Sequence, residues 1–251
     1  MIHFSPLQTG RLNVQLRELT MQESVDLAAS PPGRHEAEMT ALLRRVISTT
    51  GGPNTDPQRW TVQERILALT HYLACTSDDT MNFAVGDEGA RFLDYLDADI
   101  DAAPEFCDAG EACGEKWIAR QLNGAQAEAL ESLCSTRLQW TAGDMAARMF
   151  EAGNADGMPD AVDSPSEYTV WLKDRMALFL AMPESEFGEL HTAYLRGLGE
   201  LHHLFSLDFD AEGHIVLPKV TIGGGAAKAP ARFLAASCIG FLARHLGPRP
   251  D

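Results

Sequence analysis

Cations and long apolar runs are both scarce in this chain, and each shortage narrows what the protein can be. The 251 residues include 36 Asp and Glu against 20 Lys and Arg, so the formal net charge is -16 and the pI is about 4.8. Such an acidic chain is poorly suited to bind the phosphate backbone of a nucleic acid, or an anionic membrane, over a broad surface. We therefore expect no nucleic acid and no membrane surface as a partner.

The lack of a long apolar segment argues against a membrane-spanning or secreted protein. The longest uncharged, apolar-rich run covers residues 233–243, whereas a helix needs about 20 apolar residues to cross a bilayer. The first six residues have neither the basic start nor the apolar stretch of a secretory signal. The sequence therefore predicts no membrane span and a protein that stays in a cytosol.

Cysteine is sparse as well. The five cysteines are too few and too scattered for a disulfide scaffold, and their odd number favours free thiols in a reducing compartment. Cys107 and Cys113 form the only close pair, but their spacing is wider than that of a zinc knuckle and no His lies near them. We interpret both as loop thiols and expect no metal. A metal-binding module that adds an outside ligand such as Cys75 is an alternative.

Two loops near the C-terminus match ligand-binding patterns only in part. Residues 221–228 include Gly223, Gly224 and Gly225, but they lack the Gly-Lys-Ser/Thr ending of a phosphate-binding loop, so we interpret them as a connector. Residues 208–219 match the first part of a calcium loop, but Lys219 stands where a bidentate Glu is required. The sequence therefore predicts no catalytic residue, cofactor or metal site.

Apolar patterns in the first third of the chain predict one strand and three helices. Alternating apolar residues predict a half-buried strand over residues 11–17. Capping boxes, in which a Thr and a Glu three residues later satisfy the first helical amides, predict helices that begin after Thr20 and Thr61. Between them, an amphipathic helix is predicted by the helical spacing of Met39, Leu42, Leu43, Val46 and Ile47.

The rest of the chain has mostly helical patterns. A hairpin with a Gly-bearing turn is predicted over residues 207–217. One predicted helix has apolar residues that we expect to contact the core, namely Val170, Trp171, Ala177, Leu178 and Phe179. The predicted helices cover residues 125–138, 141–150, 166–182, 184–205 and 230–246.

These elements predict an α+β fold that is mainly α. Residues 1–115 form an N-terminal strand plus helices, and residues 116–251 form a helical C-terminal half with one β-hairpin. Turn-forming residues cluster near residues 153–165, where we expect a possible domain boundary.

An acidic segment ends the first half. Residues 78–115 contain twelve acidic residues and one base, which accounts for eleven of the net sixteen negative charges. Because apolar residues lie among these acids, the segment differs from a solvated acidic tail, and we predict that it forms a face that meets a basic partner. The acids at the centre of this predicted face are Asp94, Asp97, Asp99 and Asp101. A solvated acidic surface without a partner is the alternative. A second predicted interaction surface is the hairpin with its Gly loop, residues 207–228.

Three short phrases carry a resemblance to a known family. Residues 16–20 read Leu-Arg-Glu-Leu-Thr, residues 42–47 read Leu-Leu-Arg-Arg-Val-Ile, and residues 60–67 read Trp-Thr-Val-Gln-Glu-Arg-Ile-Leu. With the strand before them and the acidic segment after them, residues 8–115 resemble tailed-bacteriophage tail and baseplate proteins related to the T-even phage baseplate hub assembly family. The spacing of Cys107 and Cys113 departs from the Cys-x-x-Cys pair common in such sequences.

The resemblance implies a non-enzymatic protein that acts through protein contacts, either as a virion tail component or as a tail assembly chaperone. Its partners would be other phage tail and baseplate proteins, and it could form a homo-oligomer in a symmetric tail assembly. It would be located in the virion tail or in the host cytoplasm. The alternative, suggested only by the length of the chain, is an intracellular enzyme of unrecognised class.

Overall fold

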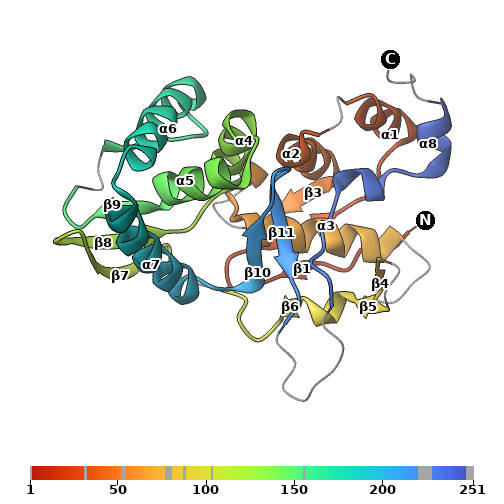
Figure 1. Ribbon diagram of the computed structural model, residues 1–251. Coiled ribbons are helices and arrows are strands. Elements are labelled where there is room, and N and C mark those ends of the chain that lie inside the picture. The colour runs from red at the N-terminus through yellow and green to blue at the C-terminus, as the bar shows by residue number, and fades with distance from the viewer. Residues whose placement is uncertain are drawn as a thin grey trace. The chain divides into compact units, whose positions relative to one another are not determined.

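The contacts within the chain divide it into two units. The structure, a computed structural model, describes residues 2–30, 33–51, 55–76, 81–86, 89–102, 104–154, 157–219 and 228–246 (Figure 1). Unit 1 contains residues 1–102, 204–208 and 214–251, and unit 2 contains residues 103–203 and 209–213. Unit 1 is therefore assembled from both ends of the sequence. The predicted division after residue 115 and the predicted boundary near residues 153–165 both fall within unit 2.

Unit 1 begins with an antiparallel sheet and three helices, of which the apolar patterns predicted one strand and the helices. The strand order is β1-β2-β3, and β2 pairs with both neighbours. The predicted strand and the three predicted helices are confirmed. The elements are β1 (Leu7–Gln8), β2 (Asn13–Leu16), α1 (Met21–Ala28), α2 (His35–Val46), β3 (Ile47–Thr50), a 3-10 turn η1 (Pro57–Arg59) and α3 (Val62–Thr76).

Capping residues determine where α1 begins. Thr20 Oγ1 accepts a hydrogen bond from Glu23 N, and Thr20 N donates to Glu23 Oε2 at 2.8 Å, which completes the capping box. Arg17 donates to both carboxylate oxygens of Glu23, and these bonds lower the pKa of Glu23 to about 2. The start of α1 is thus fixed by local contacts.

Helix α3 forms the centre of unit 1. All of residues 61–72 are buried, whereas a surface helix would bury one face only. The preceding Trp60 is fully buried too. This encirclement explains why polar side chains on α3 are found in the interior of unit 1.

The remainder of unit 1 surrounds an aromatic cluster. The ring centroids of Phe83 and Phe92 lie 5.2 Å apart, and Phe92 also contacts Phe205 and Phe233 at 6.0 Å. A small sheet of order β11-β10-β6 joins segments distant in sequence. The elements are β4 (Ala84–Val85), β5 (Ala90–Arg91), η2 (Phe92–Asp94), β6 (Leu96–Asp97), β10 (Leu204–Phe209), β11 (His214–Leu217), η4 (Ala235–Cys238) and α8 (Phe241–Leu246).

The predicted hairpin over residues 207–217 is confirmed by β10 and β11, but the predicted helix over residues 230–246 is wrong. Ala231 N donates to Val216 O at 2.9 Å, and Val216 N donates to Ala231 O at 2.7 Å. Because this pairing holds Ala231 in an extended bridge with β11, a helix cannot begin at Pro230. The segment forms only the short η4 and the six residues of α8.

The described residues of unit 2 form four helices and a three-stranded antiparallel sheet of order β7-β8-β9. Helix α7 lies directly on this sheet, since a Cβ atom added to Gly197 would come within 2.5 Å of Ala119 Cβ. The elements are β7 (Phe106–Ala112), β8 (Glu115–Arg120), α4 (Gly124–Leu133), α5 (Arg137–Arg148), β9 (Met149–Glu151), α6 (Pro165–Leu180) and α7 (Glu184–Glu200).

The sheet in unit 2 corrects the predicted fold class. A helical C-terminal half with one β-hairpin is wrong, because β8 and β9 also lie after residue 115 and join a second sheet. A two-residue turn at Cys113 and Gly114, both with positive φ, connects β7 to β8. The described residues form a mixed α/β fold with four small sheets.

No helix in the described parts of the chain has the length and apolarity needed to cross a bilayer, in agreement with the predicted absence of a membrane span.

Candidate interaction surfaces

The four acids predicted at the centre of the interface have different environments. Asp94 ends η2, and its carboxylate accepts a hydrogen bond from Arg91 N at 2.7 Å and pairs with Lys228 Nζ at 2.5 Å. The hydrogen bond from Lys228 lowers the pKa of Asp94. Asp97 lies in β6 opposite Leu204, and Asp99 is exposed. The charge of Asp94 is therefore partly balanced within unit 1.

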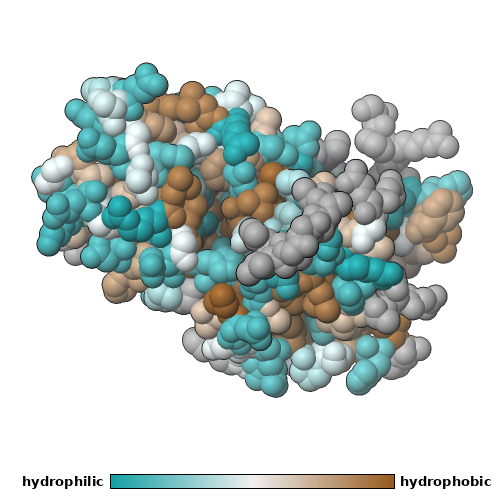
Figure 2. Space-filling view, turned by 60° about the horizontal axis from the view of Figure 1, so that its bottom comes forward, coloured by the Kyte–Doolittle hydropathy of each residue, from teal (hydrophilic) through white to brown (hydrophobic). Residues whose placement is uncertain are grey.

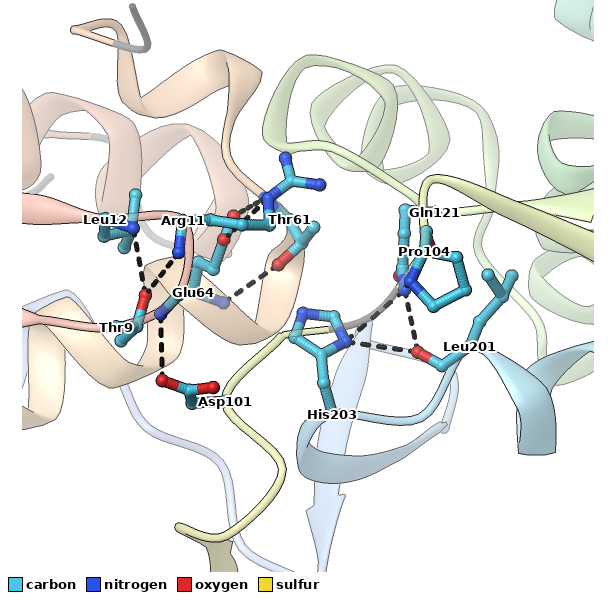
Figure 3. Close-up of polar contacts among 11 residues, drawn as sticks. Thr9, Arg11, Leu12, Thr61, Glu64, Asp101, Pro104, Gln121, Leu201 and His203 are labelled. Carbon is cyan, nitrogen blue, oxygen red and sulfur yellow. Dashed lines mark hydrogen bonds and ion pairs between the residues drawn. The ribbon is translucent and has the colours of Figure 1, made fainter. Parts of the chain in front are cut away.

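Asp101 fastens the turn between β1 and β2. Its carboxylate accepts a hydrogen bond from Gly10 N at 2.8 Å, while Thr9 Oγ1 accepts from Leu12 N at 2.9 Å (Figure 3). A Cβ atom at Gly10 would come within 2.8 Å of Ala102 Cβ, so only glycine fits there without a shift. Asp101 thus has a structural contact in addition to an exposed position. The other predicted interface residues, Gly223, Gly224 and Gly225, lie outside the described residues.

The acidic surface is concentrated in unit 2. That unit contains 19 acidic and seven basic residues, a net charge of -12 out of the total of -16. The acidic segment over residues 78–115 begins in unit 1 and ends in unit 2. The negative charge therefore belongs mainly to unit 2, and only part of it comes from the segment that the sequence singled out. A docking partner of unit 2 would meet a strongly negative surface.

Several cations of unit 2 are occupied in its interior. Arg148 Nε donates to Asp144 Oδ1 at 3.0 Å, and Tyr194 Oη donates to Asp144 Oδ2 at 2.6 Å. The guanidinium groups of Arg120 and Arg175 each lie 5.0 Å from the ring centroid of Phe150. Because these arginines are turned toward the core, fewer cations are left to offset the exposed acids.

Large apolar side chains reach the surface on two helices, of which the sequence analysis had assigned α6 to the core. The opposite side of α6 packs into unit 2, but Val170 is 62% exposed and Leu178 is 69% exposed. Ala177 is exposed too, so the predicted core contacts of these three residues are wrong; Trp171 is half-buried and Phe179 is buried. A helix with one buried face needs only one apolar stripe, whereas α6 has apolar residues on all sides. This pattern in the sequence could have indicated that some of them are exposed.

The second apolar face lies on α8 in unit 1. Phe241 is 82% exposed, Leu242 55% and Leu246 61%, whereas Ala243 is buried. Figure 2 shows that brown, apolar residues reach the surface between teal, hydrophilic ones. Clustered exposed apolar side chains are typical of contact surfaces. Helix α8 is therefore a candidate contact surface that sequence patterns did not single out.

A buried ionic cluster in unit 1 connects three elements. Arg65 on α3 donates to Glu36 Oε2 at 2.9 Å and to Thr40 Oγ1 at 2.8 Å, both on α2. His214 Nδ1 on β11 lies 3.0 Å from Glu36 Oε1. Burial by itself would raise the pKa of Glu36, but the Arg65 charge and the His214 hydrogen bond outweigh it and lower that pKa. These groups bind one another, which points to a structural role.

Glu64 forms a second buried contact in unit 1. Its carboxylate accepts from Thr61 N at 2.8 Å, which completes the capping box predicted for α3, and it pairs with Arg11 Nε at 3.0 Å (Figure 3).

In unit 2, Gln121 Nε2 donates to Leu201 O at 2.7 Å, and His203 Nδ1 lies 3.1 Å from the same oxygen (Figure 3). Gln121 thus joins the end of β8 to the end of α7.

The thiols of Cys107 and Cys113 contact backbone carbonyls. Cys107 lies in β7 and Cys113 in the following turn, not in an unstructured loop; their Sγ atoms donate to Gly197 O at 3.5 Å and to Glu186 O at 3.4 Å. Burial raises the pKa of both thiols. Among the described residues, no group of three or more His, Cys, Asp or Glu is placed to hold a metal ion. The alternative of a cysteine-based metal module therefore lacks a ligand set there.

No protein-family model, curated protein or solved structure matches this chain. The resemblance of residues 8–115 to phage baseplate assembly proteins thus stays a prediction.

Proposed function

We propose that this protein is a non-enzymatic bacteriophage tail or baseplate protein that acts through protein contacts, either as a tail component or as an assembly chaperone. The observation that carries the contact role is the exposure of large apolar side chains on α6 and α8. Such side chains cost free energy in water and gain it when a partner covers them. The phage assignment is supported by the three sequence phrases in residues 8–115.

The placement of buried ionisable groups is consistent with this role. Glu36, Arg65 and His214 bind one another, and Asp144 binds Arg148 and Tyr194. Groups paired in this way stabilise packing between elements, while catalytic groups have to face a substrate. The available charge on unit 2 is on its acidic exterior, where it can steer a basic partner.

The test is a disruption of the gene in the phage or prophage that encodes the protein. We expect particles with defective or missing tails in electron micrographs, and recovery when the intact gene is supplied in trans. Unchanged particle yield and tail morphology would refute the proposal.

Mass spectrometry of purified virions separates the two versions of the role. A tail component is present at a fixed copy number per particle, whereas a chaperone is required for assembly but absent from the finished particle. A gene position beside that of the tape-measure protein would support both versions equally.

A further inference from the structure

We infer that the protein associates with itself, by docking of α8 of one copy on the outer face of α6 of another. The inference goes beyond the proposed tail function and does not depend on it, because it uses only the surface chemistry of these two helices. Each helix has an exposed apolar face, and the charges around the two faces are opposite in sign.

The outer face of α6 is apolar and acidic. Exposed apolar residues recur on α6 at helical spacing, seven, eight and eleven positions after Val170. They are Ala177, Leu178 and the C-cap residue Ala181. This spacing places all four on one side of the helix. The exposed carboxylates of Glu167 and Asp174 lie on the same side, and the exposed Lys173 borders it, so these three residues give the face a net charge of -1. This face therefore fits an apolar helix with positive charge.

The exposed face of α8 has the matching composition. Phe241, Leu242 and Leu246 supply its apolar surface, and the ring of His245 stacks on Phe241 with a centroid distance of 6.0 Å. Arg244 adds an exposed positive charge; its Nε and Nη2 donate to Ile239 O, which holds the guanidinium beside the helix. No acidic residue occurs in α8.

Charge distribution favours another copy of this chain as the partner. Unit 2 has a net charge of -12, and α8 is a cationic segment within an otherwise acidic protein. Opposite potentials steer two surfaces together and suppress alternative pairings between like charges. Because the two faces differ, the contact is head-to-tail, which allows closed rings or open chains.

Sedimentation velocity of the full-length protein over a range of concentrations tests the contact. We expect reversible association of the wild type that increases with protein concentration. Leu178→Glu on α6 and Phe241→Glu on α8 should each weaken association by about tenfold or more. The matched control is Leu195→Glu, which changes a 53% exposed leucine on α7 and should leave association unchanged.

A mixing experiment provides the decisive result. Leu178→Glu retains an intact α8 and Phe241→Glu retains an intact α6 face, so an equimolar mixture should form a one-to-one complex that neither variant forms alone. Variants are compared only when their thermal midpoints match the wild type; Leu178→Gln and Phe241→Gln replace any that fail. A monomeric wild type, association that both variants leave unchanged, or a mixture that does not associate would overturn the inference.

Discussion

Single residues show why acidity in a sequence is an incomplete guide to an interface. Asp94 and Asp101 were predicted to face a partner, yet one pairs with Lys228 and the other holds the backbone of Gly10. Both contacts join residues far apart in the sequence, so no local pattern could reveal them. Replacement of these acids would alter unit 1 itself as well as any surface they form.

Gly10 provides a prediction at this scale. Gly10→Ala should destabilise the protein by about 1–3 kcal/mol, because its new methyl group would overlap Ala102 Cβ. The matched control is Gly188→Ala in α7, where a Cβ atom meets nothing within 4 Å and alanine should stabilise the helix by up to about 1 kcal/mol. Urea unfolding measures both changes, and equal effects at the two sites would contradict the packing described here.

Arg65 provides a second prediction. Arg65→Met should cost about 3–5 kcal/mol, since the buried carboxylate of Glu36 would lose its arginine partner. The double variant Arg65→Met/Glu36→Gln should recover much of this loss, because it removes the uncompensated charge. The measurement is the free energy of unfolding of the wild type and of the two variants at neutral pH. Additive losses in the double variant would show that Arg65 contributes by packing alone.

At the scale of elements, prediction succeeded where the signal was local. The capping boxes at Thr20 and Thr61 place the starts of α1 and α3 correctly, because every group involved lies within four residues. The sheet in unit 2 was missed, because β9 pairs with β8 from about 30 residues away. Likewise, the bridge between Ala231 and Val216 replaced a predicted helix with extended backbone.

The turn between β7 and β8 allows a prediction about an element. Cys113 has a φ of 54°, a conformation that costs most residues about 1–2 kcal/mol and that Asn adopts more readily. Cys113→Asn should leave stability unchanged or raise it by up to about 1 kcal/mol, whereas Cys113→Val should lower it. Both variants remove the thiol, so each controls for its loss. Thermal unfolding that ranks valine above asparagine would refute the role of backbone conformation.

At the scale of the whole molecule, charge is the dominant feature. With a net charge of -16, of which -12 is in unit 2, like charges repel one another in the folded state. The division into units depends on contacts between the two ends of the chain, so the location of this charge was not evident from the sequence order.

Salt dependence of stability tests this picture. Sodium chloride should raise the midpoint of thermal unfolding, because it shortens the range of repulsion between exposed acids. The variant Glu115→Lys, at an exposed position at the start of β8, should show a smaller response, since it lowers the negative charge of unit 2. A midpoint that falls with added salt would mean that attractive ion pairs outweigh the repulsion.

Amino-acid composition and order were enough to predict the strong acidity, the absence of an apolar run long enough to cross a bilayer, and the helices whose caps and apolar stripes lie within a few residues. Tertiary structure alone decided which sheet each strand joins, which acids are balanced by a cation, and that apolar residues of α6 and α8 are exposed. The physical reason is that charge and helix capping are local properties, whereas burial and strand pairing depend on which distant segments the folded chain brings together.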